Sequence, residues 1–172
     1  GLEISTDDLY ATLFNATKDS DSDAGGLINY SYLSGENITH IQNGRPLFVR
    51  TPNSKMNLAN FFLTQLYAAF APLKIGMDIL TKKENVQTDV MVAQGGLFGT
   101  PVIAQQILAN AINLPITVME TASQGGPWGM AVLAQYAASD TQETLADYLD
   151  KEVFKDPKST TLNPEPARVE GY

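Results

Sequence analysis

Apolar side chains recur every three or four residues in several stretches of this chain, which is the spacing of an amphipathic helix. In the clearest stretch, 57–81, the repeat runs from Leu58 to Leu73, and Pro72 should kink or split the helix. Before another such stretch, Thr100 suits the N-cap and Pro101 the first helical position. The predicted helices span residues 5–17, 57–81, 100–113, 126–138 and 141–154.

Short apolar runs bounded by Gly, Pro and Asn predict β-strands between these helices. They span residues 27–33, 38–41, 47–50, 86–93 and 114–119. The pair Asn43-Gly44 is a strong hairpin signal between the second and third of these strands. Three strands in a row, followed by strands that alternate with helices, predict an α/β fold with a mixed five-stranded sheet and helices on both faces.

The end of the chain differs from the rest. Residues 155–172 carry prolines and little periodicity, so we expect an extended or disordered tail there. The remaining length suits one domain, which we place at residues 1–154. The chain does not begin with Met, so we expect it to be an excised piece of a longer protein.

Composition narrows the classes of function. A net charge of −8 argues against nucleic-acid binding, which needs a basic surface to neutralise phosphates. No apolar run is long enough to span a bilayer, so we expect no membrane segment. The chain has no Cys, which excludes disulfides, thiol catalysis and thiolate metal sites. Because no secretion signal is visible, the expected compartment is the cytoplasm.

The most informative stretch is residues 90–101, VMVAQGGLFGTP. An apolar run ends in a glycine pair, and a helical pattern follows at once. Glycines let backbone N–H groups approach a ligand that a Cβ would keep away, and the following helix N-terminus favours an anion. This geometry suits a nucleotide; the alternative is an ordinary tight turn between strand and helix.

A second glycine-rich turn, residues 123–129, follows the next predicted strand. Ligands of open α/β sheets bind in the crevice at the carboxyl ends of the strands, so the two turns should form the walls of one crevice. Trp128 could stack on a base and Glu120 could bind a ribose hydroxyl, but packing and a solvated strand end are the more common roles of such residues.

Other kinds of site are disfavoured. The acidic run at 19–23 resembles the start of a calcium loop, but Ala24 and Tyr30 stand where that loop needs Gly and Glu. His40 is the only His, which excludes a multi-His metal site. The chain has no Gly-Lys-Ser/Thr phosphate loop.

Four segments, in order, resemble the C-terminal domain of the FGGY carbohydrate kinases. Residues 26–36 (GLINYSYLSGE) resemble that family's G-L-x-x-x-P-Y-x-S-G-E strand and turn, with Ser31 in place of Pro. Residues 57–80 are similar to the long helix that follows the family's β-meander. The resemblance as a whole is to ribulokinase- and xylulokinase-like members.

The two glycine-rich segments complete the resemblance. Residues 95–116 resemble the family's adenosine motif in its ribulokinase form, with Asn110 where the family usually has Asp. Residues 122–131 resemble the second glycine-rich turn and helix start, with Met130 at a small-residue position. The resemblance implies cofactor-binding roles for Gly95, Gly96, Leu97, Phe98, Gly99, Gln106, Asn110, Gly125 and Gly126.

The resemblance implies a ribonuclease-H-like, or actin-like, ATPase domain and an ATP-dependent carbohydrate kinase. Such an enzyme transfers the γ-phosphate of ATP to a hydroxyl of a pentulose or a related sugar or polyol. This chain would be the half that binds ATP or ADP with Mg²⁺, the Mg²⁺ being held mainly through the nucleotide and the missing N-terminal domain. The sugar and the catalytic Asp base would also belong to that domain, so no catalytic residue is assigned here. A homodimer of the full-length enzyme stays open.

Some alternatives stay open as well. Phe98 fits a core position as well as an adenine pocket, and Gln106 and Asn110 fit polar helix positions that bind no ligand. The departures at Ser31, Asn110 and Met130 are also compatible with a non-catalytic actin-like module whose nucleotide site has decayed. Binding of ATP or ADP separates the two functions.

Overall fold

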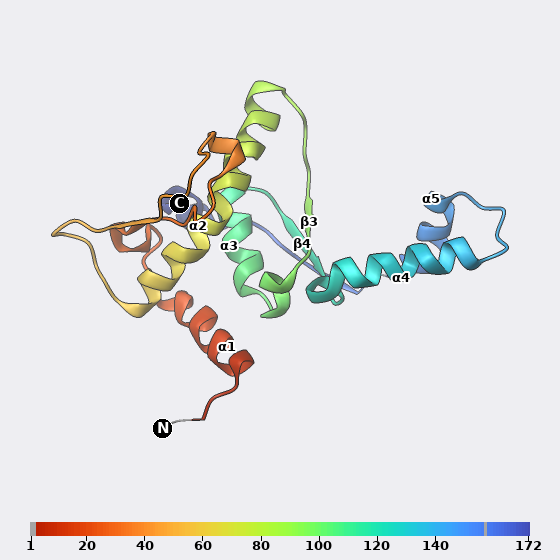
Figure 1. The fold of residues 1–172 in the computed structure, drawn as a ribbon, viewed down its shortest axis with the longest axis horizontal. Coiled ribbons are helices and arrows are strands. Elements are labelled where there is room, and N and C mark those ends of the chain that lie inside the picture. Colours follow the sequence, from red (N-terminus) through yellow and green to blue (C-terminus); the bar gives the residue numbers. More distant parts are fainter. Residues whose placement is uncertain (1–2, 157) are drawn as a thin grey trace.

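The structure is a computed structural model that describes residues 3–156 and 158–172. Residues 1 and 2, at the start of the predicted domain, and residue 157, in the predicted tail, lie outside the described residues. The long helix α2 (Leu58–Asp78) and the shorter helix α3 (Ile103–Ile112) pack against each other in the centre of the molecule, and α1 (Thr6–Ala16) contacts both (Figure 1).

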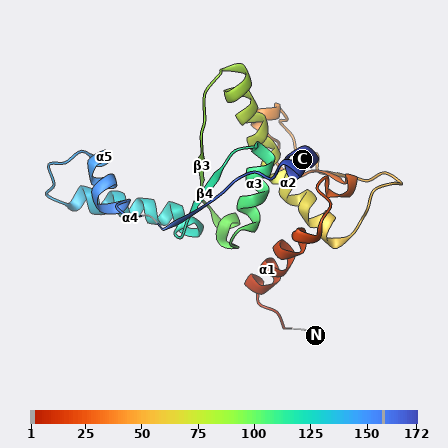
Figure 2. The same ribbon diagram turned by 180° about the vertical axis from the view of Figure 1, so that it is seen from behind.

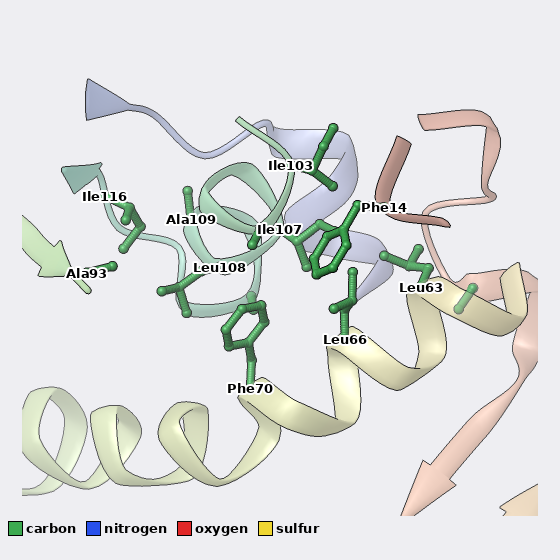
Figure 3. Packing of buried hydrophobic residues seen from close by; sticks show 13 residues of the cluster. Phe14, Leu63, Leu66, Phe70, Ala93, Ile103, Ile107, Leu108, Ala109 and Ile116 are labelled. Atoms are coloured by element: carbon green, nitrogen blue, oxygen red, sulfur yellow. The ribbon is translucent and has the colours of Figure 1, made fainter. Parts of the chain in front are cut away.

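The apolar stripes of these helices form the core (Figure 3). Phe70 on α2 lies beside Leu108 on α3, which is only 2 % exposed, and Leu66 on α2 points toward Phe14 and Ile107. Phe14 on α1 closes one end of this cluster and meets Phe62 edge to face, with 5.4 Å between ring centroids. The helical periodicity of the sequence therefore identified the buried surface only in part, because Leu66 and Phe70 are buried while Leu58 and Leu73, the ends of the predicted repeat, are exposed.

The α/β class is confirmed, but the strands form two small sheets instead of one five-stranded sheet. One sheet pairs β1 (Ile28–Tyr30) with β2 (Leu47–Val49), antiparallel. The other has β4 (Ile116–Met119) in the middle, parallel to β3 (Met91–Ala93) and antiparallel to β5 (Ser159–Leu162).

The strand predicted at 38–41 is wrong. A 3₁₀ turn occupies Asn37–Thr39, and the only strand-like feature is an isolated bridge between Glu36 and Ile41. The Glu36 carboxylate accepts a hydrogen bond from the Ile38 N–H at 3.1 Å, so this acid caps a turn. His40 has a φ of 58°, in the left-handed region, which ends any extended conformation there.

The predicted tail holds regular structure. β5 pairs with β4, and α6 (Pro166–Gly171) follows it back to α3. The buried amide of Gln105 donates to the carbonyls of Ile116 and Thr160, both at 2.8 Å, and so joins the two strands. Of the two expectations for this segment, the extended one fits β5, while a disordered end does not hold for the described residues.

Three of the helices differ from the prediction. α2 runs without a break through Pro72, so the predicted split does not occur. α3 begins at Ile103, after Val102 at a φ of 74°, instead of at Thr100. The last predicted helix begins only after Thr144, whose hydroxyl accepts a hydrogen bond from the Asp147 N–H.

The helix α4 (Gly125–Ala138) leaves the body sideways and, with α5 (Leu145–Tyr148), forms an arm (Figures 1 and 2). None of the α4 residues is buried. On β3, Met91 and Ala93 face the helical core, while Val92 between them is 54 % exposed. Helices thus cover one face of this sheet, and the prediction of helices on both faces is not met. Among the described residues, no helix is both long and apolar enough to cross a membrane.

Candidate functional site

The two glycine-rich turns lie side by side at the carboxyl ends of β3 and β4. These strands are parallel neighbours, with Ala93 opposite Val118 in the register. Just beyond them, the N–H of Gly95 donates to the carbonyl of Ala122 at 2.7 Å. The crevice that the sequence predicted at this edge therefore has both of its expected walls.

The first turn continues as a 3₁₀ turn at Gly96–Gly99. Gly95 has a φ of 125°, a conformation that L side chains rarely adopt. A Cβ added to Gly95 or Gly96 would find no atom within 4 Å, so both glycines border open space. This face of the turn is free for a ligand that approaches the backbone closely.

The second turn contains two glycines with different roles. A Cβ on Gly125 would collide with the side chain of Gln94, so this glycine lets the two turns pack together. Gly126, by contrast, has no atom within 4 Å of a Cβ position. Of the two predicted ligand positions, only Gly126 is open to solvent at its Cα.

A hollow of about 860 Å³ lies between α1 and the two turns. Its walls include Tyr10, Ala11, Gly96, Leu97, Thr100 and Ser123. The volume is large enough for a nucleoside, since ligand pockets commonly measure a few hundred to about a thousand Å³. It combines apolar surface with hydroxyl groups, which is the composition that a base and a ribose require.

A second hollow, of about 580 Å³, lies on the other side of the first turn. It is lined in part by Phe98 and by residues of the C-terminal segment, among them Lys158 and Thr160. Neither Gly95 nor Gly96 lines it. Of the two hollows, only the larger one, beside α1, is lined by a residue of the glycine pair, Gly96.

The predicted adenine-pocket residues Leu97 and Phe98 are both half-buried and pack against the hydrophobic core. Leu97 lines the larger hollow and Phe98 the smaller one. Gly99 borders both. These residues thus combine a core contact with a surface that a ligand can reach.

Gln106 and Asn110 lie elsewhere, on the face of α3 toward the C-terminal segment. Asn110 is 4 % exposed, and its Oδ1 accepts from the Glu165 N–H at 2.8 Å. The Gln106 amide donates to Asn110 at 3.1 Å and to the carbonyl of Asn163 at 2.9 Å. Neither residue lines either hollow, and both amides are used to hold residues 163–165 against α3.

Sequence reasoning missed the contribution of α1, which supplies one whole wall of the larger hollow. Asp7 and Asp8 lie at its first turn, and the Ser5 hydroxyl accepts from the Asp8 N–H at 3.1 Å as a helix cap. The sequence shows the capping pattern but not which distant element the helix approaches. Among the described residues that line this hollow there is no Lys, Arg or His.

The described residues offer no cluster of side chains for a metal centre. Within the part of the chain that the structure describes, no group of three or more His, Cys, Asp or Glu side chains could hold a metal ion. Any Mg²⁺ that accompanies a nucleotide would need ligands beyond these side chains.

The sequence profile described as "FGGY family of carbohydrate kinases, C-terminal domain" matches residues 2–138. The chain belongs to the FGGY family of carbohydrate kinases. No curated protein sequence matches it significantly. The FGGY profile covers both glycine-rich turns and α1, and ends where α4 ends.

Solved structures of xylulose, gluconate and glycerol kinases have a similar fold. A ligand-bound xylulose kinase and a gluconate kinase, both from Lactobacillus acidophilus, superpose with a TM-score of 0.71 at 20 % and 21 % identity. The glycerol kinase of Plasmodium falciparum, determined with ADP, gives a TM-score of 0.66 at 16 % identity. The matches cover 98 %, 98 % and 93 % of this chain but 33 %, 33 % and 31 % of those proteins. The chain thus has the fold of an actin-like ATPase domain and spans about a third of the length of these relatives.

Proposed function

We propose that this chain is the ATP-binding part of a carbohydrate kinase that transfers the γ-phosphate of ATP to a hydroxyl of a pentulose or a related sugar or polyol. The observation that carries the proposal is the open face of Gly96 beside a hollow walled by both glycine-rich turns. The FGGY membership and the similarity to a glycerol kinase determined with ADP support it.

In this proposal the larger hollow takes the nucleoside. Leu97 and Tyr10 offer apolar surface to the base, while the hydroxyls of Thr100 and Ser123 can bind the ribose. The phosphates would leave the hollow toward the domain that holds the sugar. Phosphoryl transfer depends mostly on positioning and on charge stabilisation. One part of the enzyme can therefore position ATP while the other binds the sugar and supplies the base.

The alternative is a non-catalytic module with a decayed nucleotide site. It is favoured by the engagement of Asn110, at a family Asp position, with the C-terminal segment. Loss of nucleotide binding distinguishes this alternative, because a kinase half must still bind ATP while a decayed module need not.

The test is a titration of the 172-residue chain with ADP, followed by NMR or calorimetry. We expect weak binding with resonance changes centred on Gly95–Gly99, because part of the closed site is absent and water enters freely. Replacing Gly96 by Val places a side chain in the open space and should abolish binding. Gly76→Val is the matched control, since Gly76 lies in α2 with no atom within 4 Å of its Cβ position and lines neither hollow.

Three results would contradict the site. They are no binding at millimolar ADP, resonance changes elsewhere in the chain, or a Gly96→Val variant that binds as well as the parent. The first of these favours the decayed module.

A further inference from the structure

The segment that joins the first glycine-rich turn to α3 has a strained backbone. Val102 has a φ of 74° and a ψ of −49°, and the Ile103 N–H donates to the carbonyl of Pro101 at 2.9 Å. This is a γ-turn of the rare kind with a positive central φ. A β-branched residue seldom adopts a positive φ, because its side chain meets its own backbone there. The Val102 side chain is 53 % exposed, so its packing does not offset the strain.

The first turn of α3 also has unused hydrogen-bond donors. Among the described residues, no backbone carbonyl accepts from the N–H of Ala104 or of Gln105, although Ala104 is fully buried and Gln105 is 3 % exposed. Buried N–H groups without a partner are rare in native structures. No side chain caps this end of the helix either, and so the nearby hydroxyl of Thr100 is not used as a cap.

One local rearrangement would resolve these features. If Val102 takes helical φ and ψ, α3 begins at Pro101 with Thr100 as its N-cap. Thr is a favoured N-cap, and Pro is a favoured first helical residue. The two unused N–H groups of α3 then reach the carbonyls of Thr100 and Pro101, four residues back, and the strain at Val102 is released.

The core holds both ends of this segment and leaves its middle free. Phe98 packs against the hydrophobic core before the segment, and Ile103 is buried in the core after it. Between them, Gly99, Pro101 and Val102 are exposed. The rearrangement can therefore stay local, because no buried side chain has to leave the core.

We propose that residues 100–102 are a conformational switch at the start of α3. The γ-turn form exchanges with a helical form in which α3 is longer by two residues, or about 3 Å. Thr100 and Pro101 line both hollows, so the exchange moves a wall that the two hollows share. A ligand in one hollow that contacts this wall differently in the two forms shifts the exchange and so reshapes the other hollow. This inference goes beyond the proposed function, because it does not depend on which ligand binds.

The experiment follows the amides of Ala104 and Gln105 in the free 172-residue chain, by NMR chemical shifts and by relaxation dispersion, which detects μs–ms exchange. We expect exchange at both amides in the parent chain. Val102→Gly should shift the populations toward the γ-turn about tenfold, because Gly adopts a positive φ without strain and disfavours a helix. Asn113→Gly is the matched control. Asn113 has a φ of 53° at the other end of α3, and its replacement should leave the exchange at the two amides unchanged.

A second variant makes the test independent of the added glycine. Thr100→Ala removes a hydroxyl that serves as a cap only in the helical form, so it should reduce the population of that form about fivefold. The resonances of Ala104 and Gln105 should then move in the same direction as in Val102→Gly.

Two results would overturn the switch. One is that the amides of Ala104 and Gln105 show no exchange in the parent and keep their resonances in Thr100→Ala. The other is that Val102 has purely helical carbon shifts in the parent, which would leave no γ-turn to exchange with. If Val102→Gly fails to fold, Thr100→Ala decides between these results. Because no nucleotide is added, a failure of the proposed function leaves the outcome of this experiment unaffected.

Discussion

The phenol of Tyr172 donates a hydrogen bond to the backbone carbonyl of Tyr67 at 3.2 Å, and the two rings meet edge to face with centroids 4.7 Å apart. The phenol of Tyr67 in turn donates to the carbonyl of Ser22 at 2.7 Å. This pair fastens the end of the C-terminal segment to α2 and to the loop after α1. Burial raises the pKa of Tyr67 and raises the pKa of Tyr172 to about 12.

These pKa values predict a loss of stability in alkali. An exposed tyrosine in the unfolded chain has a pKa of about 10, so above that pH the unfolded chain loses phenol protons that the folded chain keeps. The contribution is fully present below about pH 10 and is lost as the pH rises toward 12. We expect the free energy of unfolding, measured in urea, to fall over this range. The fall should be smaller in Tyr172→Phe, and identical falls in both proteins would contradict the assignment.

The side-chain amide of Gln105 should be important for stability. Gln105 is 3 % exposed, and its amide donates hydrogen bonds to the carbonyls of both Ile116 and Thr160. Gln105→Ala leaves these acceptors without a donor, which should cost about 2–4 kcal/mol. Gln106→Ala is the neighbouring control, and because the Gln106 side chain is itself only half-buried, water can replace its hydrogen bonds and the change should cost about 1 kcal/mol or less. Urea denaturation measures both. Equal losses would show that the buried amide does not join β4 to β5 in solution.

Two glycines should respond to alanine in opposite directions. Gly25 has a φ of 65°, and a Cβ there would lie 2.7 Å from the Lys55 carbonyl and collide with the Asn60 side chain. Gly25→Ala should therefore destabilise the fold by about 2 kcal/mol or more. Gly76→Ala, in the open helical site, should stabilise it by about 0.5–1 kcal/mol. Thermal denaturation of the two variants gives the sign of each effect, and a neutral Gly25→Ala would contradict the packing of this loop.

The helices were predictable because their apolar periodicity is a local property that packing reinforces. Leu66 and Phe70 recur at helical spacing, and both are among the residues that α2 buries. β5 was missed because Thr160 and Thr161 show no alternation of apolar and polar residues. Its pairing depends on backbone groups and on the distant amide of Gln105, which no local pattern reveals.

In the candidate site, too, the features that depend on local sequence were predictable and those that depend on distant contacts were not. Gly95 and Gly96 stand out in the sequence because glycine pairs after an apolar run are a local signal, and the structure places them on an open face. The wall formed by α1 depends on a contact between residues far apart in the chain, so Asp7 could not be placed there. Asn110 was assigned through a resemblance, and its hydrogen bond to Glu165 shows a different use of that position.

The last prediction concerns activity: the 172-residue chain should not phosphorylate sugars by itself. No residue matches the family's Asp base, and the chain spans 33 % of the length of the similar xylulose kinase. General-base catalysis contributes about 10²–10⁴-fold to such rates, and positioning of the acceptor contributes more, so loss of both leaves the rate near that of water. The measurement is sugar-dependent release of ADP from ATP and Mg²⁺, with an intact sugar kinase as the assay control. Sugar-dependent release that disappears in Gly96→Val would contradict the prediction, because it would locate complete kinase chemistry in this chain. Release that Gly96→Val leaves unchanged would point to a contaminating enzyme instead.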